Sequence, residues 1–286
     1  MGMGWHEWPL MIFTVLGQSV AGAFIVMAAV LLRGNLEADR ALRIQGRMFF
    51  LWLLLGIAFM ASALHLGSPL RAMNSLNRIG ASGLSNEILC GSLFFAAGGL
   101  YWLLAVLGKM PVVLGRLWLM LTMAMALLFV WGMSQVYQIN TVPTWYSGYT
   151  TLSFFVTMLI GGPLLGYLLL RSVEMESASL YLLPLISCFA ALVGVVSAGM
   201  QGSGLATIHS AVQQAYALVP DFAGLLALRS VLLALGLGCW LCPLLRGRAP
   251  SPMTLALALI LVLAGELVGR GVFYGLHMSV GVVVSG

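Results

Sequence analysis

Two residues that can accept protons, His65 and Glu87, stand at neighbouring boundaries of apolar segments. His65 lies at the end of the segment 48–66 and Glu87 directly precedes the segment 88–107, so consecutive helices would hold both side chains at the same depth. Oxidation of a quinol releases two protons with two electrons, and a histidine or carboxylate beside its hydroxyl groups is a suitable acceptor. A structural role is equally open, because a histidine at a helix C-terminus and an acid at an N-terminus complement the helix dipole.

The four histidines share one end of the predicted bundle. His6 precedes the first apolar segment, and His65, His209 and His277 lie in or beside connections on that same side. Most of the arginines fall in the connections of the other side. Because histidine changes charge near neutral pH, this sidedness favours redox or proton chemistry at a single face.

Eight apolar stretches dominate the chain, which has 286 residues, 61% of them hydrophobic and only 7% charged. This composition excludes an ordinary soluble domain. Each stretch can cross a hydrocarbon core about 30 Å thick, and helices satisfy their own backbone hydrogen bonds in lipid. We therefore predict an all-α polytopic membrane protein, with residues 1–286 as a single integral membrane domain. The predicted helices span residues 9–32, 48–66, 88–107, 112–137, 152–170, 180–200, 225–245 and 253–276.

Nine of the thirteen lysines and arginines lie in or beside the connections of one side. By the positive-inside rule this side faces the cytoplasm, and both termini are expected outside. If the host is a Gram-negative bacterium, that is the periplasmic side of the inner (cytoplasmic) membrane. The nine residues are Arg33, Arg40, Arg43, Arg47, Lys109, Arg116, Arg171, Arg246 and Arg248.

The connections on the outer side are long and mostly uncharged. Residues 68–80 fit a short interfacial helix that Ser68 caps, with Arg71 and Arg78 on its polar side. Residues 205–219 show a similar two-sided pattern and predict a second such helix. Long polar loops on one face of a bundle usually bind a ligand or a partner.

Polar residues also lie inside two apolar segments. Glu266 and Arg270, four residues apart, share a helix face with Phe273 and His277. A carboxylate within the membrane needs a partner, and Arg270 supplies one, so we favour a structural ion pair here over a functional one. His277 lies near enough to the outer end to join a site there. Gln18 fits a hydrogen bond between helices better than a ligand contact.

The sequence does not predict a haem, an iron–sulfur cluster or another metal site in this chain. A bis-histidine haem needs histidines within the membrane, whereas all four lie at one rim. Cys239 and Cys242 form a CxxC, but on an apolar helix, where ordinary packing is the simpler interpretation. If a quinol is oxidised here, its electrons must leave through another polypeptide.

Several long motifs resemble those of a known family. They are GWHEWPL at 4–10, HLGSPLRA at 65–72, NSLNR at 74–78, LSNE at 84–87, ATIHS at 206–210, VQQ at 212–214, GE at 265–266, GR at 269–270 and FYGLHM at 273–278. With these motifs the protein resembles, nearly end to end, the membrane anchor subunit of bacterial dimethyl sulfoxide reductase and its close paralogue, the anchor of the selenate-reducing enzyme.

The resemblance implies a three-subunit enzyme of anaerobic respiration. A molybdopterin catalytic subunit and an electron-transfer subunit with four iron–sulfur clusters would dock on the periplasmic face of this protein. The anchors of this family bind and oxidise menaquinol without haem, and His65 and Glu87 fall on family positions associated with the quinol site. We therefore expect these two residues to accept the protons. The residues expected to contact the quinol are Gln18, Ser68, Arg71, Arg78 and His277.

Two functions from other classes stay as alternatives. A pure scaffold would anchor its partners without quinol chemistry, and would need the outer loops but not His65. A secondary transporter would place its polar groups near the membrane midplane, on broken helices related by an internal repeat. No convincing repeat is present, which makes the transporter the weaker alternative.

Overall fold

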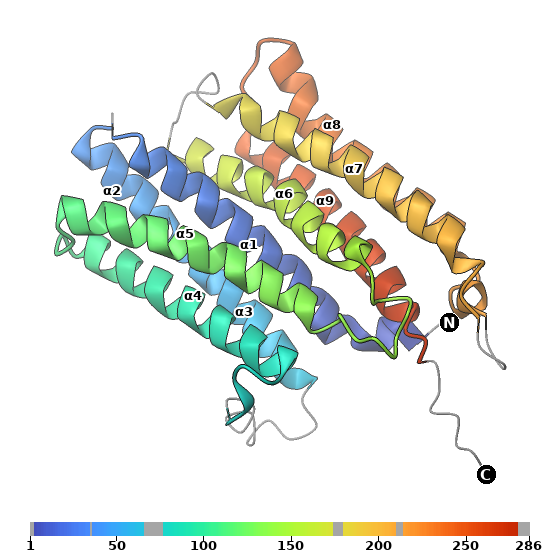
Figure 1. Ribbon diagram of the computed structural model, residues 1–286. Coiled ribbons are helices and arrows are strands. Elements are labelled where there is room, and N and C mark those ends of the chain that lie inside the picture. The colour runs from blue at the N-terminus through green and yellow to red at the C-terminus, as the bar shows by residue number, and fades with distance from the viewer. Residues whose placement is uncertain (1–2, 35, 66–76, 174–179, 210–213, 280–286) are drawn as a thin grey trace.

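The computed structural model describes residues 3–34, 36–65, 77–173, 180–209 and 214–279. Within these ranges, eight helical segments are long and apolar enough to cross a membrane, as predicted, and together they form a bundle (Figure 1). α2 and α3, which meet at Met48, together form one of these segments. The elements are η1 (Met3–Glu7), α1 (Trp8–Leu32), α2 (Ala38–Arg47), α3 (Phe49–Leu64), α4 (Gly83–Val106), α5 (Val112–Gln135), α6 (Gly148–Arg171), α7 (Leu182–Leu205), η4 (Ala215–Leu218), α8 (Phe222–Leu245) and α9 (Pro252–Gly275).

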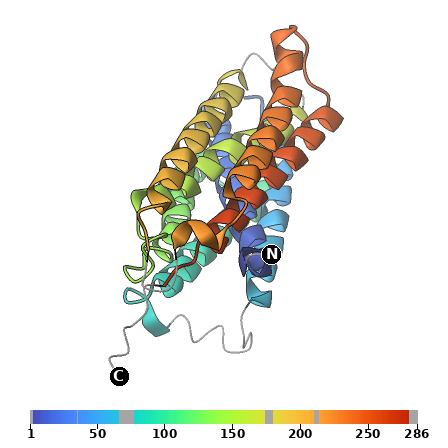
Figure 2. The same cartoon turned by 90° about the vertical axis from the view of Figure 1, so that its right-hand side faces the viewer.

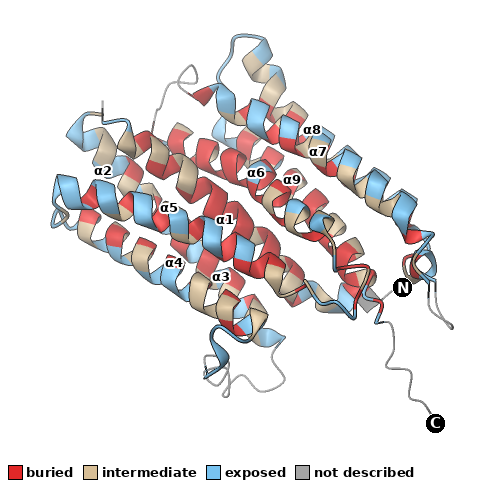
Figure 3. Cartoon of the chain, viewed as in Figure 1, coloured by how far each residue is buried: buried red, intermediate tan, exposed pale blue. Residues whose placement is uncertain are grey.

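α1 and α6 form the centre of the bundle, and their buried surfaces stand out in Figure 3. Small residues allow the two helices to touch along their backbones. A Cβ atom added at Gly162 would lie 2.5 Å from the Cα atom of Gly22, and one added at Gly161 would overlap Oγ of Ser19. Contacts of this kind drive helix association in lipid, where apolar burial alone gives little advantage.

The other helices pack on either side of this central pair. α3 and α5 pack against α1, with α4 outside them, and α7 and α9 pack against α6, with α8 beside both. Figure 2 shows the bundle from the side on which α7 and α8 lie, with these two helices in front. Aromatic rings fill the space between α1, α3, α4 and α5. Their members are Phe13, Phe24, Trp52, Phe59, Phe94 and Phe129.

Both ends of the described chain lie at the same end of the bundle. The 3-10 helix η1 packs against the last turns of α9, where a Cβ atom on Gly4 would overlap the backbone of Gly271 and Gly275. The α1–α2, α4–α5 and α8–α9 connections lie at the opposite end, and most of the basic residues lie in these connections or in the helix turns beside them (Figure 1). The predicted separation of histidines from arginines is therefore present in the fold.

Several helix boundaries differ from the predicted ones, and the start of α4 is the difference that affects a predicted site residue. α4 begins at Gly83 instead of residue 88, because Ser82 has the extended backbone of an N-cap and Asn86 Oδ1 accepts a 2.7 Å hydrogen bond from the Gly80 N–H. Glu87 consequently lies one turn inside the helix. The hydropathy pattern missed this turn because it carries no strongly apolar run.

The described residues 205–209 and 214–219 do not form the interfacial helix that the sequence predicted for 205–219. α7 extends to Leu205, His209 and Gln214 pair as an isolated antiparallel bridge, and η4 follows. Ala215 and Val219 are buried in a small apolar cluster at the end of α9, and this packing determines the path of the loop. Most of the other predicted interfacial helix, including Ser68 and Arg71, lies outside the described residues.

The central contact can be tested by adding a single methyl group. Gly162→Ala forces α1 and α6 apart, and overpacking of this kind costs about 1–3 kcal/mol. We expect a lower midpoint of thermal unfolding for the purified protein, measured by tryptophan fluorescence. Gly99→Ala adds the same methyl group to α4 with no atom within 4 Å, and should leave the midpoint unchanged. Equal midpoints for the two variants would contradict the α1–α6 packing described here.

Candidate functional site

A cavity of about 540 Å³, here called the rim cavity, opens at the end of the bundle that carries the histidines. Its walls come from η1 and α1, the end of α3, the segment between α5 and α6, η4, and the end of α9. The lining residues are Glu7, Leu10, His65, Tyr137, Trp145, Ala217, Leu218, Tyr274, Gly275 and His277. Two predicted site residues, His65 and His277, therefore share one cavity.

His65 faces a carboxylate that the sequence analysis did not assign to the site. His65 follows α3 directly, and Glu7 is the last residue of η1. Nδ1 of His65 lies 3.1 Å from Oε2 of Glu7, at ion-pair distance but without the alignment of a hydrogen bond. An imidazole can bind a proton near neutral pH. The pair is therefore suited to receiving a proton from a group in the cavity.

Other lining residues are aromatic, and two of them carry hydroxyl groups. The hydroxyl oxygens of Tyr137 and Tyr274 lie 2.7 Å apart. The indole of Trp145 stacks on Phe273, with 5.3 Å between ring centroids, and donates a 2.8 Å hydrogen bond to the Phe273 carbonyl. The His277 ring lies 4.7 Å from the Trp145 ring. These contacts hold the aromatic part of the lining in place, which suits an aromatic ligand.

Glu87 is not among the lining residues of the cavity. Its side chain is buried, and the Glu87 backbone packs against Gly132 on α5. Oε1 of Glu87 has no hydrogen-bond partner among the described residues, but its charge interacts electrostatically with Tyr137 and Tyr274. Tyr137 and Tyr274, unlike Glu87, line the cavity with hydroxyl groups that can donate and accept a proton.

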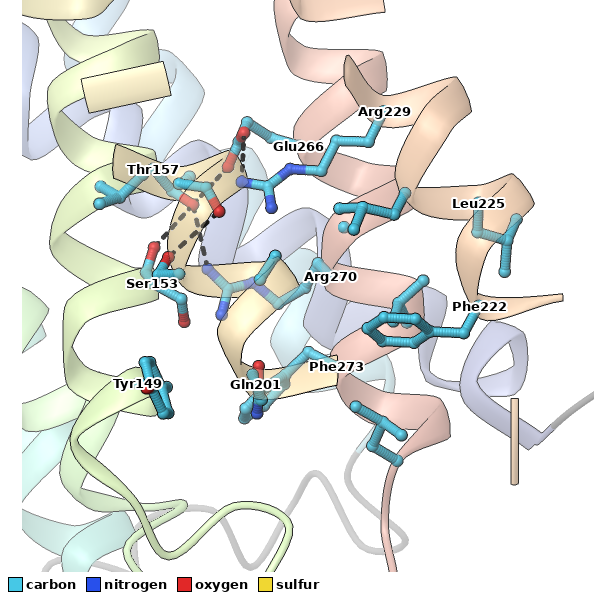
Figure 4. Close-up of a pocket in the computed structure, with 18 residues that line it drawn as sticks. Tyr149, Ser153, Thr157, Gln201, Phe222, Leu225, Arg229, Glu266, Arg270 and Phe273 are labelled. Atoms are coloured by element: carbon cyan, nitrogen blue, oxygen red, sulfur yellow. Dashed lines mark hydrogen bonds and ion pairs between the residues drawn. The ribbon is translucent and has the colours of Figure 1, made fainter. Parts of the chain in front are cut away.

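Gln18 belongs to a different part of the protein, a buried network at greater depth. Its Oε1 accepts a 2.9 Å hydrogen bond from Nη2 of Arg270. The four-residue spacing predicted an ion pair between Glu266 and Arg270, and this prediction is wrong. Oε1 of Glu266 instead pairs with Nη2 of Arg229 on α8 at 3.0 Å, and its Oε2 accepts a hydrogen bond from Thr157 on α6 (Figure 4). The difference arises because α8 and α6 place Arg229 and Thr157 closer to the Glu266 carboxylate than the next turn of α9 places Arg270.

One further predicted ligand, Arg78, does not line the rim cavity. Arg78 is exposed in the turn before α4, and Ser68 and Arg71 lie outside the described residues. The cavity instead uses Glu7, Tyr137 and Tyr274, none of which carried a spacing signal. Trp145 had appeared in the sequence only as an interfacial aromatic residue.

Within the described part of the protein, no three side chains of His, Cys, Asp or Glu are grouped as a metal site requires. Cys239 and Cys242 are free thiols on α8. The chemistry that this geometry offers is therefore proton acceptance beside an aromatic cavity.

Comparison with known proteins agrees with the motifs. The family model described as DMSO reductase anchor subunit (DmsC) matches residues 1–276. The sequence is 58% identical to two proteins of Escherichia coli K12, the C and YnfH chains of anaerobic dimethyl sulfoxide reductase, over the full length of both partners in each comparison. It is 42% identical to the C-type chain of the same reductase from Haemophilus influenzae, again over both full lengths. The protein therefore belongs to the family of dimethyl sulfoxide reductase anchor subunits and is a multi-pass protein of the inner membrane.

Proposed function

We propose that this protein anchors a molybdenum-containing reductase in the membrane and oxidises menaquinol in the rim cavity. The observation that carries the proposal is the cavity itself, which holds the His65–Glu7 pair on one wall and the Tyr137–Tyr274 hydroxyl pair on another. Its volume of about 540 Å³ lies within the range of small-molecule sites, about 300–1,000 Å³. The flat Trp145 surface suits a naphthoquinol ring.

Menaquinol loses two electrons and two protons when it becomes menaquinone. In the proposed reaction His65 accepts one proton directly from a ring hydroxyl, and Glu7 stabilises the imidazolium that forms. The second proton passes through the hydroxyl groups of Tyr137 and Tyr274 to Glu87. The two electrons leave for the nearest iron–sulfur cluster of a partner subunit, which delivers them to a molybdopterin catalytic subunit.

The direction of the reaction across the membrane follows from the basic residues. Nine of them lie at the end opposite the rim cavity, and the positive-inside rule places that end in the cytoplasm. Both termini and the rim cavity are then periplasmic, and the partner subunits dock there. Exposed aromatic side chains surround this end and suit such an interface, among them Trp5, Trp8, Tyr146 and Tyr216.

Membership of the anchor family leaves the pure scaffold as the competing function. A scaffold would still need η1, η4 and the outer loops to hold its partners. It would have no use for a proton acceptor in a cavity of this size, or for a buried carboxylate without a hydrogen-bond partner among the described residues.

Substitutions at the two proton acceptors distinguish these functions. In membranes that contain equal amounts of assembled complex, we expect His65→Ala and Glu87→Gln to lower menaquinol-dependent turnover by on the order of 10²-fold, because each removes a proton acceptor. Binding of a fluorescent quinol-site inhibitor should weaken in His65→Ala. The matched control is His209→Ala, which removes an exposed histidine at the same end but outside the cavity. Unchanged turnover in both test variants would support the scaffold. Loss of the complex from the membrane would indicate a structural role instead.

Replacing Glu7 with glutamine keeps the shape of the side chain but removes its charge. The side chains of His65 and Glu7 are 42% and 36% exposed, so solvent screens the pair and its contribution is modest. We expect Glu7→Gln to lower kcat about two- to fivefold with little change in KM, which corresponds to less than about 1 kcal/mol. Glu37→Gln, an exposed glutamate before α2, serves as the control. A kcat equal to that of the native complex would show that Glu7 plays no part in proton acceptance.

A further inference from the structure

A second and smaller cavity, here called the deep cavity, has a volume of about 60 Å³ and lies among α6, α7, α8 and α9 (Figure 4). Arg229, Glu266 and Arg270 line its inner part, and Gln201 and Phe222 line it toward the end that holds the rim cavity. A liquid water molecule occupies about 30 Å³, so this space suits one or two groups of that size. A naphthoquinone ring is too large for it.

Two positive groups meet a single negative group at this cavity. Arg229 forms an ion pair with Glu266 at 3.0 Å. Arg270, which is 4% exposed, donates to the neutral side chains of Gln18 at 2.9 Å and Thr157 at 3.3 Å, and lies 3.9 Å above the ring of Phe154. None of these three neighbours carries a negative charge, although Thr157 in turn donates to Glu266. One positive charge therefore stays unbalanced inside the bundle.

Among the described residues that line the deep cavity, Glu266 is the only carboxylate. Glu266 lies nine residues before the end of α9 at Gly275, about 14 Å along the helix axis. Within the described ranges, it is the only acidic residue that forms an ion pair with either arginine. The two acidic residues outside those ranges, Glu174 and Glu176, come after the end of α6 in the sequence. A buried charge without a counter-charge is strongly disfavoured in a membrane.

An enclosed hydrogen-bond donor lies at the same place. Nε of Arg229 is inaccessible to solvent and has no hydrogen-bond partner among the described residues. The guanidinium packs directly on α9 at Gly269, where an added Cβ atom would lie 2.8 Å from Nε. The α9 backbone thus holds Arg229 beside the deep cavity. There the Nε–H group of Arg229 has no acceptor among the described residues, and the two arginines carry one more positive charge than Glu266 balances.

We infer that the deep cavity binds a small inorganic anion, of the size and charge of chloride, between Arg229 and Arg270. The anion balances the extra positive charge and accepts hydrogen bonds from guanidinium donors. Water alone can accept such bonds but leaves the charge uncompensated. A phospholipid head group carries the right charge, but with its glycerol ester it exceeds the volume of about 60 Å³. This site is independent of quinol oxidation in the rim cavity.

The test measures thermal unfolding of the purified full-length protein in nanodiscs of zwitterionic lipid. Sodium chloride is titrated against sodium gluconate at constant ionic strength, because gluconate is too large for the cavity. A ligand that binds only the folded protein raises the midpoint of unfolding as its concentration increases. We expect a chloride-dependent rise in the native protein, and a similar rise with bromide.

Variants that change the charge at the deep cavity in opposite directions test whether chloride binds there. Arg229→Gln leaves no excess charge and should weaken chloride binding by about tenfold or more. Glu266→Gln adds one to the excess positive charge and should tighten binding. Arg246→Gln removes an equal charge from the exposed end of α8 and should bind chloride as the native protein does.

Equal unfolding midpoints in chloride and gluconate would overturn the inference, as would the same chloride response in all four proteins. If phosphatidylglycerol in the nanodisc abolishes the chloride effect, the natural occupant is a lipid phosphate group and an inorganic anion is the wrong assignment. The tightening expected in Glu266→Gln keeps the test decisive even if Arg229→Gln does not fold.

Discussion

The close contact between α1 and α6 is the constraint on which both polar sites depend. Helices in lipid gain little from apolar burial, so their association needs close backbone packing and internal partners for polar groups. Gly22 and Gly162 provide that close approach. The same contact brings Gln18 of α1 to Arg270, and α6 supplies Thr157 to Glu266. At the end of α1, η1 packs on α9 and Glu7 reaches His65.

α9 connects the two sites, and it gives each of them a different physical character. Arg270 lies in the buried network, whereas Tyr274 and His277, one and two turns later, line the rim cavity. The rim cavity has partly exposed proton acceptors and room for a ring, so it suits an exchangeable ligand. The deep cavity has buried charges and little space, so it suits a resident ion. The stack of Trp145 on Phe273 holds α9 between these two environments.

The sequence predicted the eight spanning segments and their sidedness, because hydropathy and the distribution of arginines act over whole helices. It could not predict the first turn of α4, which depends on the local backbone at Ser82. The Arg229–Glu266 pair was missed because spacing along one helix says nothing about a neighbouring helix. Glu7 was missed for the same reason, since its partner is 58 residues away in sequence and meets it only through the packing of η1.

Photo-crosslinking tests quinol oxidation in the rim cavity most directly. An azido-naphthoquinol is added to membranes that contain the assembled complex, and the membranes are illuminated during turnover. Mass spectrometry of peptides then identifies the residues to which the probe is attached. If menaquinol binds in the rim cavity, we expect the probe to label peptides that contain Leu10, Trp145 or Leu218. An excess of an unlabelled menaquinol analogue should reduce this labelling. Labelling confined to the lipid-facing surfaces of α4 and α5, or labelling that the analogue does not reduce, would contradict a quinol site in this cavity.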